Sequence, residues 1–218
     1  MAAIIKTFCD DYDNCNTYLY IKNETAIIID PANDVKQILK SVGNVKIVGI
    51  FITHGHYDHF KNLSEIMSKT DCPVYLSKKA YEKLFNKDTS CASYFTNNFV
   101  CEYDEKRFVF VSDGQKIMVA NDFEVLIWQT KGHTDCGICL FIDDNIFTGD
   151  TLFCKGVGRS DLPTSNTIQL IASIKRLMDL KKDYNVYPGH DKMTTIFDEQ
   201  KNNPFYNLSL IHIWRCRR

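Results

Sequence analysis

Metal-binding chemistry is concentrated in one short segment of the sequence, residues 54–59, which reads HGHYDH. His54 and His56 point the same way in an extended segment, whereas a turn into a following helix brings Asp58 and His59 round, so two adjacent metal sites can be served. These groups follow the apolar run 45–53, where they would repel one another or lose solvation unless a cation organised them. Histidine and aspartate suit Zn, Fe or Mn, and no thiolate is required.

Three further groups with metal-binding side chains each follow directly after another strand-like run. They are Gly132-His133-Thr134, Gly149-Asp150-Thr151 and Gly189-His190-Asp191. Together with residues 54–59 they include five of the six histidines, and the sixth lies near the C-terminus. If these strand ends share one edge of the sheets, seven candidate ligands converge there: His54, His56, Asp58, His59, His133, Asp150 and His190. Periodicity alone leaves that convergence a hypothesis.

Short strands interleaved with a few helices must position these side chains, and we find no internal repeat or low-complexity tract. Runs rich in Ile, Val, Tyr and Phe predict strands over residues 3–8, 17–22, 25–30, 45–53, 73–77, 107–111, 115–119, 123–130, 137–143, 145–149 and 184–188. The pattern is typical of an α/β protein.

Helical spacing of apolar residues predicts helices over residues 34–42, 61–69, 78–85 and 164–180. The last of these is the longest, with Thr164 or Ser165 as its candidate N-cap and an apolar face that includes Ile171, Ile174 and Met178. The polar, aperiodic stretch 86–105 is a long connection that either covers a pocket or runs over the solvated surface.

Length, charge and cysteine content narrow the functional classes. The 218 residues fit one domain, and 26 basic against 27 acidic side chains give a net charge of −1, which disfavours nucleic-acid and anionic membrane partners. No run approaches the roughly 18 apolar residues that cross a bilayer, and the N-terminus does not resemble a signal peptide. Nine scattered cysteines indicate reduced thiols without disulfides. We therefore expect a soluble, cytoplasmic protein, and its oligomeric state is left open.

The last eleven residues differ in amino-acid composition from the residues before them. Residues 208–218 read LSLIHIWRCRR, which adds three arginines and a tryptophan after a polar stretch and resembles the translated end of a sequencing adapter. We interpret residues 208–218 as a non-native tail and residues 1–207 as the domain; the alternative is a genuine apolar C-terminus. The tail is excluded from functional argument.

The order of these motifs resembles the metallo-β-lactamase superfamily over nearly the whole chain. The resemblance rests on HxHxDH at 54–59, the histidine of GHT, the aspartate of GDTLF and the histidine of PGH. It implies a single-domain, four-layer αββα sandwich with a binuclear metal site where strand-end loops meet. It further implies that the first metal is held by His54, His56 and His133, the second by Asp58, His59 and His190, and that Asp150 bridges them. Asp30 resembles the aspartate that braces the histidine loop from the second shell, with a plain turn-forming role as the alternative.

Within the superfamily, the stretches 149–153 (GDTLF), 158–163 (GRSDLP) and 203–205 (NPF) are similar to the glyoxalase II-like, or hydroxyacylglutathione hydrolase-like, branch. Asp150 stands where the best-known β-lactamases have cysteine, which disfavours antibiotic hydrolysis. The branch's C-terminal helical domain, which supplies much of the glutathione pocket, is absent from this sequence. Its glycine pair after DLP is Thr164-Ser165 here, so the local pocket shape stays open.

The resemblance predicts a metal-dependent hydrolase acting on a small-molecule thioester or ester such as S-lactoylglutathione. Two divalent ions, Zn²⁺ with Fe or Mn as alternatives, would share a water and lower its pKa towards roughly 7. Asp58 is the predicted catalytic residue, which binds the second metal and orients the hydroxide. Arg159 is either the partner of a substrate carboxylate or a structural ion-pair residue.

Other functions stay open on the sequence alone. A persulfide dioxygenase-like oxidoreductase would use one iron held by His54, His133 and Asp150. A nuclease of the same superfamily is weakened by the absence of a basic surplus, and a catalytically silent module is disfavoured because all seven ligand types are present. The Cys136 to Cys139 C-x-x-C motif is interpreted as structural because no second pair accompanies it.

Overall fold

The protein is described by a computed structural model that covers residues 2–9, 12, 14–99, 102–120 and 123–206. Residues 208–218, which we interpret as a non-native tail, lie outside the described residues. Of the helices in the described part of the chain, none combines the length and apolar character needed to cross a membrane.

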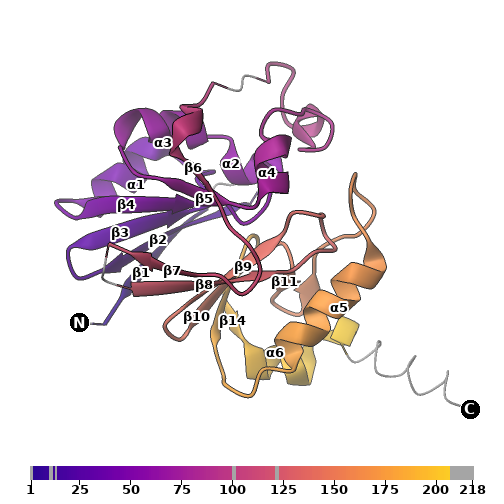
Figure 1. Cartoon of the computed structure of the whole chain (residues 1–218). Coiled ribbons are helices and arrows are strands. Elements are labelled where there is room, and N and C mark those ends of the chain that lie inside the picture. Colours follow the sequence, from indigo (N-terminus) through magenta and orange to yellow (C-terminus); the bar gives the residue numbers. More distant parts are fainter. Residues whose placement is uncertain (1, 10–11, 13, 100–101, 121–122, 207–218) are drawn as a thin grey trace, which may run out of the picture.

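Two six-stranded sheets form the middle of the molecule (Figure 1). The first has the order β1 (Ile4–Cys9), β2 (Asn16–Lys22), β3 (Thr25–Ile29), β4 (Lys46–Phe51), β5 (Val74–Leu76) and β6 (Phe108–Phe110). The second has the order β14 (Thr194–Thr195), β13 (Asn185–Pro188), β10 (Asn145–Gly149), β9 (Ile138–Ile142), β8 (Phe123–Gln129) and β7 (Lys116–Val119). A small hairpin joins β11 (Leu152–Phe153) to β12 (Gly156–Val157).

Helices cover the outer faces of both sheets (Figure 1). The first sheet is covered by α1 (Val35–Val42), α2 (Tyr57–Phe60), α3 (Leu63–Lys69) and α4 (Lys78–Lys83). The second is covered by α5 (Thr167–Met178) and α6 (Ile196–Asn202). Two 3₁₀ turns, η1 (Ala92–Tyr94) and η2 (Glu105–Arg107), lie in the connection before β6. The layers confirm the expected single-domain αββα sandwich.

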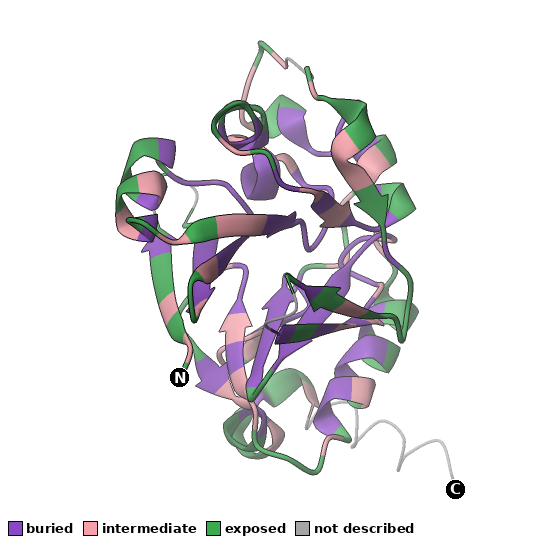
Figure 2. Ribbon diagram, turned by 60° about the vertical axis from the view of Figure 1, so that its left-hand side comes forward, coloured by how far each residue is buried: buried purple, intermediate pink, exposed green. Residues whose placement is uncertain are grey.

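The core is divided into three apolar layers, one between the sheets and one under each set of helices. Strands β3, β9 and β10 are buried almost throughout, because both faces of each sheet are covered (Figure 2). Such strands read as continuous apolar runs rather than as alternating ones, which is how their positions were predicted.

The predicted elements match the structure closely, with corrections at the longest helix. Helix α5 begins after Asn166, whose side chain accepts the Gln169 backbone N–H at 3.0 Å, so neither Thr164 nor Ser165 is the N-cap. Ile171 is 48% exposed, because the face that packs on the sheet is formed by neighbours such as Ile174 and Met178. Helix α6 was not predicted as a separate element, because its sequence is polar apart from its first turn.

Candidate metal centre

Three histidines form a first group at the edge of the sandwich. His54 and His56 follow β4, and His133 follows β8 from the other sheet. The Nδ1 atom of His56 lies 3.1 Å from Nε2 of His54 and 2.9 Å from Nε2 of His133, and all three residues are buried. Nitrogen atoms that converge in this way from two sheets form a donor set suited to one cation.

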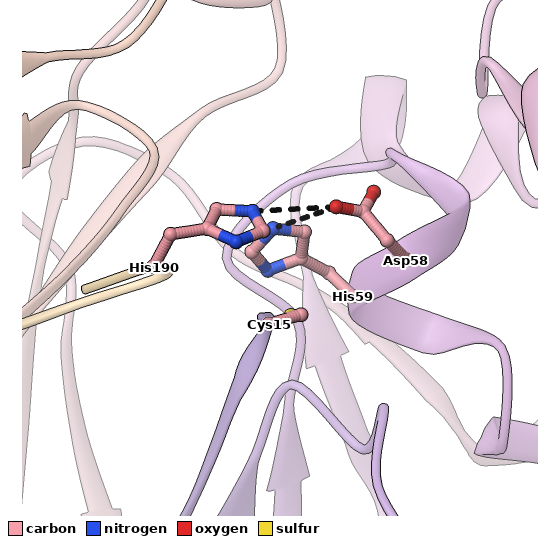
Figure 3. A group of neighbouring side chains, drawn as sticks. All are labelled: Cys15, Asp58, His59 and His190. Carbon is pink, nitrogen blue, oxygen red and sulfur yellow. Dashed lines mark ion pairs between the residues drawn. The ribbon is translucent and has the colours of Figure 1, made fainter. Parts of the chain in front are cut away.

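A second group lies beside the first and comes from two parts of the chain (Figure 3). Helix α2 begins at Tyr57 and turns Asp58 and His59 inward, and His190 follows β13. Nε2 of His190 lies 3.3 Å from Oδ2 of Asp58, and Nε2 of His59 lies 3.7 Å from the same oxygen. Two imidazoles and one carboxylate thus face a common point.

Asp150 lies between the two groups. Its Oδ2 is 3.3 Å from Nε2 of His133 and 3.5 Å from Nε2 of His190, and its Oδ1 is 3.3 Å from Nε2 of His59. The neighbouring backbone must approach closely, because a Cβ at Gly189 would lie 2.2 Å from Oδ1 of Asp150. One carboxylate is therefore within reach of both donor sets.

The far nitrogens of the imidazoles are anchored by the surrounding loops. Nδ1 of His59 contacts Oδ2 of Asp30 at 2.9 Å, and the Thr53 hydroxyl donates to the same oxygen at 2.6 Å. Nδ1 of His133 contacts the backbone carbonyl of Arg159 at 2.9 Å. Such contacts fix the ring orientation and leave Nε2 facing the centre.

The structure places all seven candidate ligands in this centre, together with the bracing candidate Asp30, and their binding of metal stays a prediction. Nε2 of His59 and Oδ1 of Asp150 are buried without a hydrogen-bond partner in the described structure. Buried polar atoms of this kind are costly unless something else satisfies them. A pair of cations bound by nitrogen and oxygen would satisfy both, so the donor chemistry fits divalent Zn, Fe or Mn.

The electrostatics of the centre reflect the crowding. Burial, together with the neighbouring His133, lowers the pKa of His56 to about 3. Burial favours the neutral form of Asp58, but His59 and His190 outweigh burial and lower the pKa of this carboxyl below its usual value. A neutral imidazole and an ionised carboxylate are the forms that bind metal.

Sequence reasoning gave no role to Cys15, whose Sγ lies within 4.8 Å of donor atoms from Asp58, His59 and His190. In Figure 3 the His59 ring lies between Cys15 and the carboxylate of Asp58, so the thiol approaches from the other side of that ring. The signal for this placement is the backbone bridge between Cys15 and His190, which no sequence pattern shows. None of the seven described cysteines forms a disulfide, and Cys136 accepts the Gly55 N–H at 3.2 Å.

A cavity of about 610 Å³ opens over the centre. Its floor contains five of the candidate ligands, and its wall is lined by Tyr12, Cys91, Tyr94, Phe95, Phe153, Val157, Arg159 and Leu162. Arg159 lies in the wall of this cavity, where its guanidinium forms two hydrogen bonds, of 2.7 and 2.8 Å, with Asp161. Its contact with a substrate carboxylate stays a prediction. Sequence reasoning assigned these aromatic wall residues no role, because Tyr12, Tyr94 and Phe95 lie outside the strands in segments without apolar periodicity, and Phe153 lies in the two-residue strand β11.

Comparison with known proteins places the chain in a family. Residues 10–190 match the family model described as the Metallo-beta-lactamase superfamily. The chain is 34% identical over 202 residues to a probable metallo-hydrolase, M6_Spy0554, of Streptococcus pyogenes, covering 88% of this chain and 85% of that protein. It is 30% identical over 202 residues to the hydroxyacylglutathione hydrolase GloC of Haemophilus influenzae, covering 89% and 92%. The crystal structure of ETHE1 from Myxococcus xanthus superposes with a TM-score of 0.74 at 29% identity, covering 92% and 83%.

Proposed function

The chain belongs to the metallo-β-lactamase superfamily, and we propose that it is a metal-dependent hydrolase of the glyoxalase II-like branch that cleaves thioesters such as S-lactoylglutathione. The observation that carries the proposal is Asp150, which lies between the donor set of His133 and that of His59 and His190. A carboxylate shared by two donor sets suits a pair of metal ions, which is the arrangement that hydrolytic chemistry uses. Similarity to GloC supports a thioester as the substrate.

The seven side chains would bind two metal ions. The first ion would be held by His54, His56 and His133, the second by Asp58, His59 and His190, and Asp150 would contact both. When bound, the ions supply Lewis acidity and a water whose pKa is lowered towards neutrality. Asp58, which also lines the cavity, is ionised and would accept a hydrogen bond from that water and so orient it.

The cavity favours water over a side chain as the nucleophile. Among the described residues that line it, Cys91 is the one with a thiol. Burial raises the pKa of Cys91, and the charge of Asp58 raises it further, so this thiol stays protonated and is a poor nucleophile. The lining therefore supports hydrolysis without a covalent intermediate on the protein.

A persulfide dioxygenase-like activity is the second candidate, since the ETHE1 structure is similar over 92% of this chain. That reaction would need one iron, held by His54, His133 and Asp150. The hydrolase is preferred because Asp58, His59 and His190 form a second donor group beside the first, and a single iron would leave it unused.

One experiment separates the two candidates. The purified protein is loaded with zinc, iron or manganese, its metal content is measured, and it is assayed without oxygen on S-lactoylglutathione and with oxygen on glutathione persulfide. We expect two metal ions per chain, anaerobic thioester cleavage, and loss of cleavage in His56→Ala or after chelation. One iron per chain with oxygen uptake on the persulfide would favour the dioxygenase, and full turnover by His56→Ala would refute the hydrolase.

A further inference from the structure

The wall of the cavity above the metal centre is apolar and comes from separate segments of the chain. Tyr12 precedes β2, Tyr94 and Phe95 lie at η1, Phe153 ends β11, and Leu162 lies in the loop before α5. Tyr94 is 70% exposed, which means that it offers its ring to solvent or to a ligand rather than to the core. Aromatic side chains grouped over a polar floor are typical of small-molecule sites that bind an apolar group.

The wall carries little net charge. Arg159 is the one charged side chain among the described lining residues apart from the candidate ligands. Its guanidinium forms a bidentate pair with Asp161, so the two charges cancel at the rim. A substrate carboxylate placed against this wall would lose hydration without gaining an uncompensated cation, whereas an apolar group would gain contact area.

The wall is attached directly to the catalytic floor. The Tyr57 N–H donates to the Ser90 carbonyl at 2.8 Å, and the Tyr57 ring packs against Phe95 with centroids 6.1 Å apart. Tyr57 begins α2, the helix that carries Asp58 and His59. Because α2 carries Asp58 and His59 and its Tyr57 also packs against Phe95, a group bound beside Phe95 is held at a fixed place relative to the reacting bond.

We propose that this wall selects thioesters whose acyl group is uncharged and apolar, and aromatic in particular, over those whose acyl group carries a carboxylate. The inference rests on the proposed thioester hydrolysis and adds its substrate class. The thioester carbonyl lies at the polar floor, and the acyl side chain packs against Tyr94, Phe95 and Leu162. The volume of about 610 Å³ accommodates an aryl group together with the thiol part of the substrate.

A matched substrate series tests the selection. Acetyl, phenylacetyl and succinyl thioesters of one thiol, N-acetylcysteamine, are compared by kcat/KM at fixed metal content. We expect the phenylacetyl ester to exceed the acetyl ester by about tenfold, which is the order of effect of burying a phenyl group, and the succinyl ester to fall below both. Tyr94→Ala lowers the value for the phenylacetyl ester several-fold, and by a larger factor than it lowers the value for the acetyl ester.

Phe197→Ala is the matched control, because Phe197 is also an exposed aromatic residue but lies on α6, away from the cavity lining. Binding of the corresponding non-hydrolysable amides, measured by calorimetry, gives a second readout that does not depend on turnover. Equal kcat/KM values across the series, a preference for the succinyl ester, or equal affinities of the three amides would overturn the selection. If the amides bind in the expected order while no thioester is cleaved, the proposed hydrolysis fails and the apolar site stands.

Discussion

Removal of the Asp135 carboxylate tests how the histidine-rich segment 54–59 is held in place. Lys83 on α4 is 4% exposed, and its ammonium group lies 3.0 Å from Oδ1 of Asp135 and donates to the Thr164 hydroxyl. Its stem fills the space under Gly55, where an added Cβ would lie 2.7 Å from Cβ of Lys83. Asp135→Asn would leave this ammonium group buried without its counter-charge.

The expected cost follows from burial. Removing one partner of a buried ion pair costs about 3 kcal/mol, because the remaining charge is desolvated and uncompensated. For a chain of this length that corresponds to a fall in Tm of roughly 6–12 °C. Lys79 pairs with the same carboxylate at 2.7 Å, but its side chain is 56% exposed, so Lys79→Met is the matched control and should change stability by less than about 1 kcal/mol.

Urea unfolding at several pH values is the assay. Burial raises the pKa of Asp135, but Lys79 and Lys83 outweigh burial and lower it below its usual value. The stabilisation is therefore full above the unfolded pKa of about 3.9 and is lost as the pH falls through the lower folded pKa. The difference between wild type and Asp135→Asn should be constant from pH 7 to 5 and shrink below about pH 4. Equal effects of Asp135→Asn and Lys79→Met at pH 7 would refute the reasoning.

Three further substitutions test other parts of the structure. Asp30→Asn should weaken binding of the second metal about 10–100-fold in a chelator competition, because Oδ2 of Asp30 orients His59; unchanged affinity would leave Asp30 a plain turn residue. Cys136→Ser should keep kcat/KM for thioester cleavage within about twofold, and loss of cleavage would show that the thiol takes part in the chemistry. Glu199→Ala should destabilise the protein by about 2 kcal/mol in urea unfolding, because this fully buried carboxylate accepts the Lys155 N–H and the Asn203 amide; a change below about 0.5 kcal/mol would count against it.

The strands could be predicted from the sequence where the sheet they belong to is buried on both faces. Continuous apolar runs marked β3, β4 and β10, and the chemistry-bearing residues directly after β4 and β10 identified one functional edge. Short elements escaped prediction, because β14 has two residues, Thr194–Thr195, and its pairing with β13 gives no apolar signal. The start of α5 at Asn166 escaped because several residues that can cap a helix precede it.

The candidate ligands were predictable because each of them is a polar residue placed where an apolar strand ends. The groups that surround them were not, since their roles depend on contacts across the fold. Cys15 reaches His59 only because its backbone pairs with that of His190. Tyr94 and Phe95 lie in the connection 86–105, whose polar, aperiodic sequence fits a pocket cover and a solvated surface loop equally well. They line the cavity because Tyr57 anchors that connection to α2.

Thr164 and Ser165 show how this chain compensates for its departure from the glycine pair at that turn. Thr164 has φ +67°, a left-handed conformation that costs a β-branched residue energy, yet its hydroxyl lies 3.2 Å from that of Thr134 and accepts a hydrogen bond from Lys83. The Ser165 hydroxyl donates to the backbone carbonyl of His133 at 2.6 Å. Side-chain hydrogen bonds thus connect this turn to His133 and to the lysine under the histidine segment. In a protein with glycines at these positions the turn would be free of strain. It would lack the side-chain contacts that connect Lys83 of α4, which lies under the histidine segment, to the loop that carries His133.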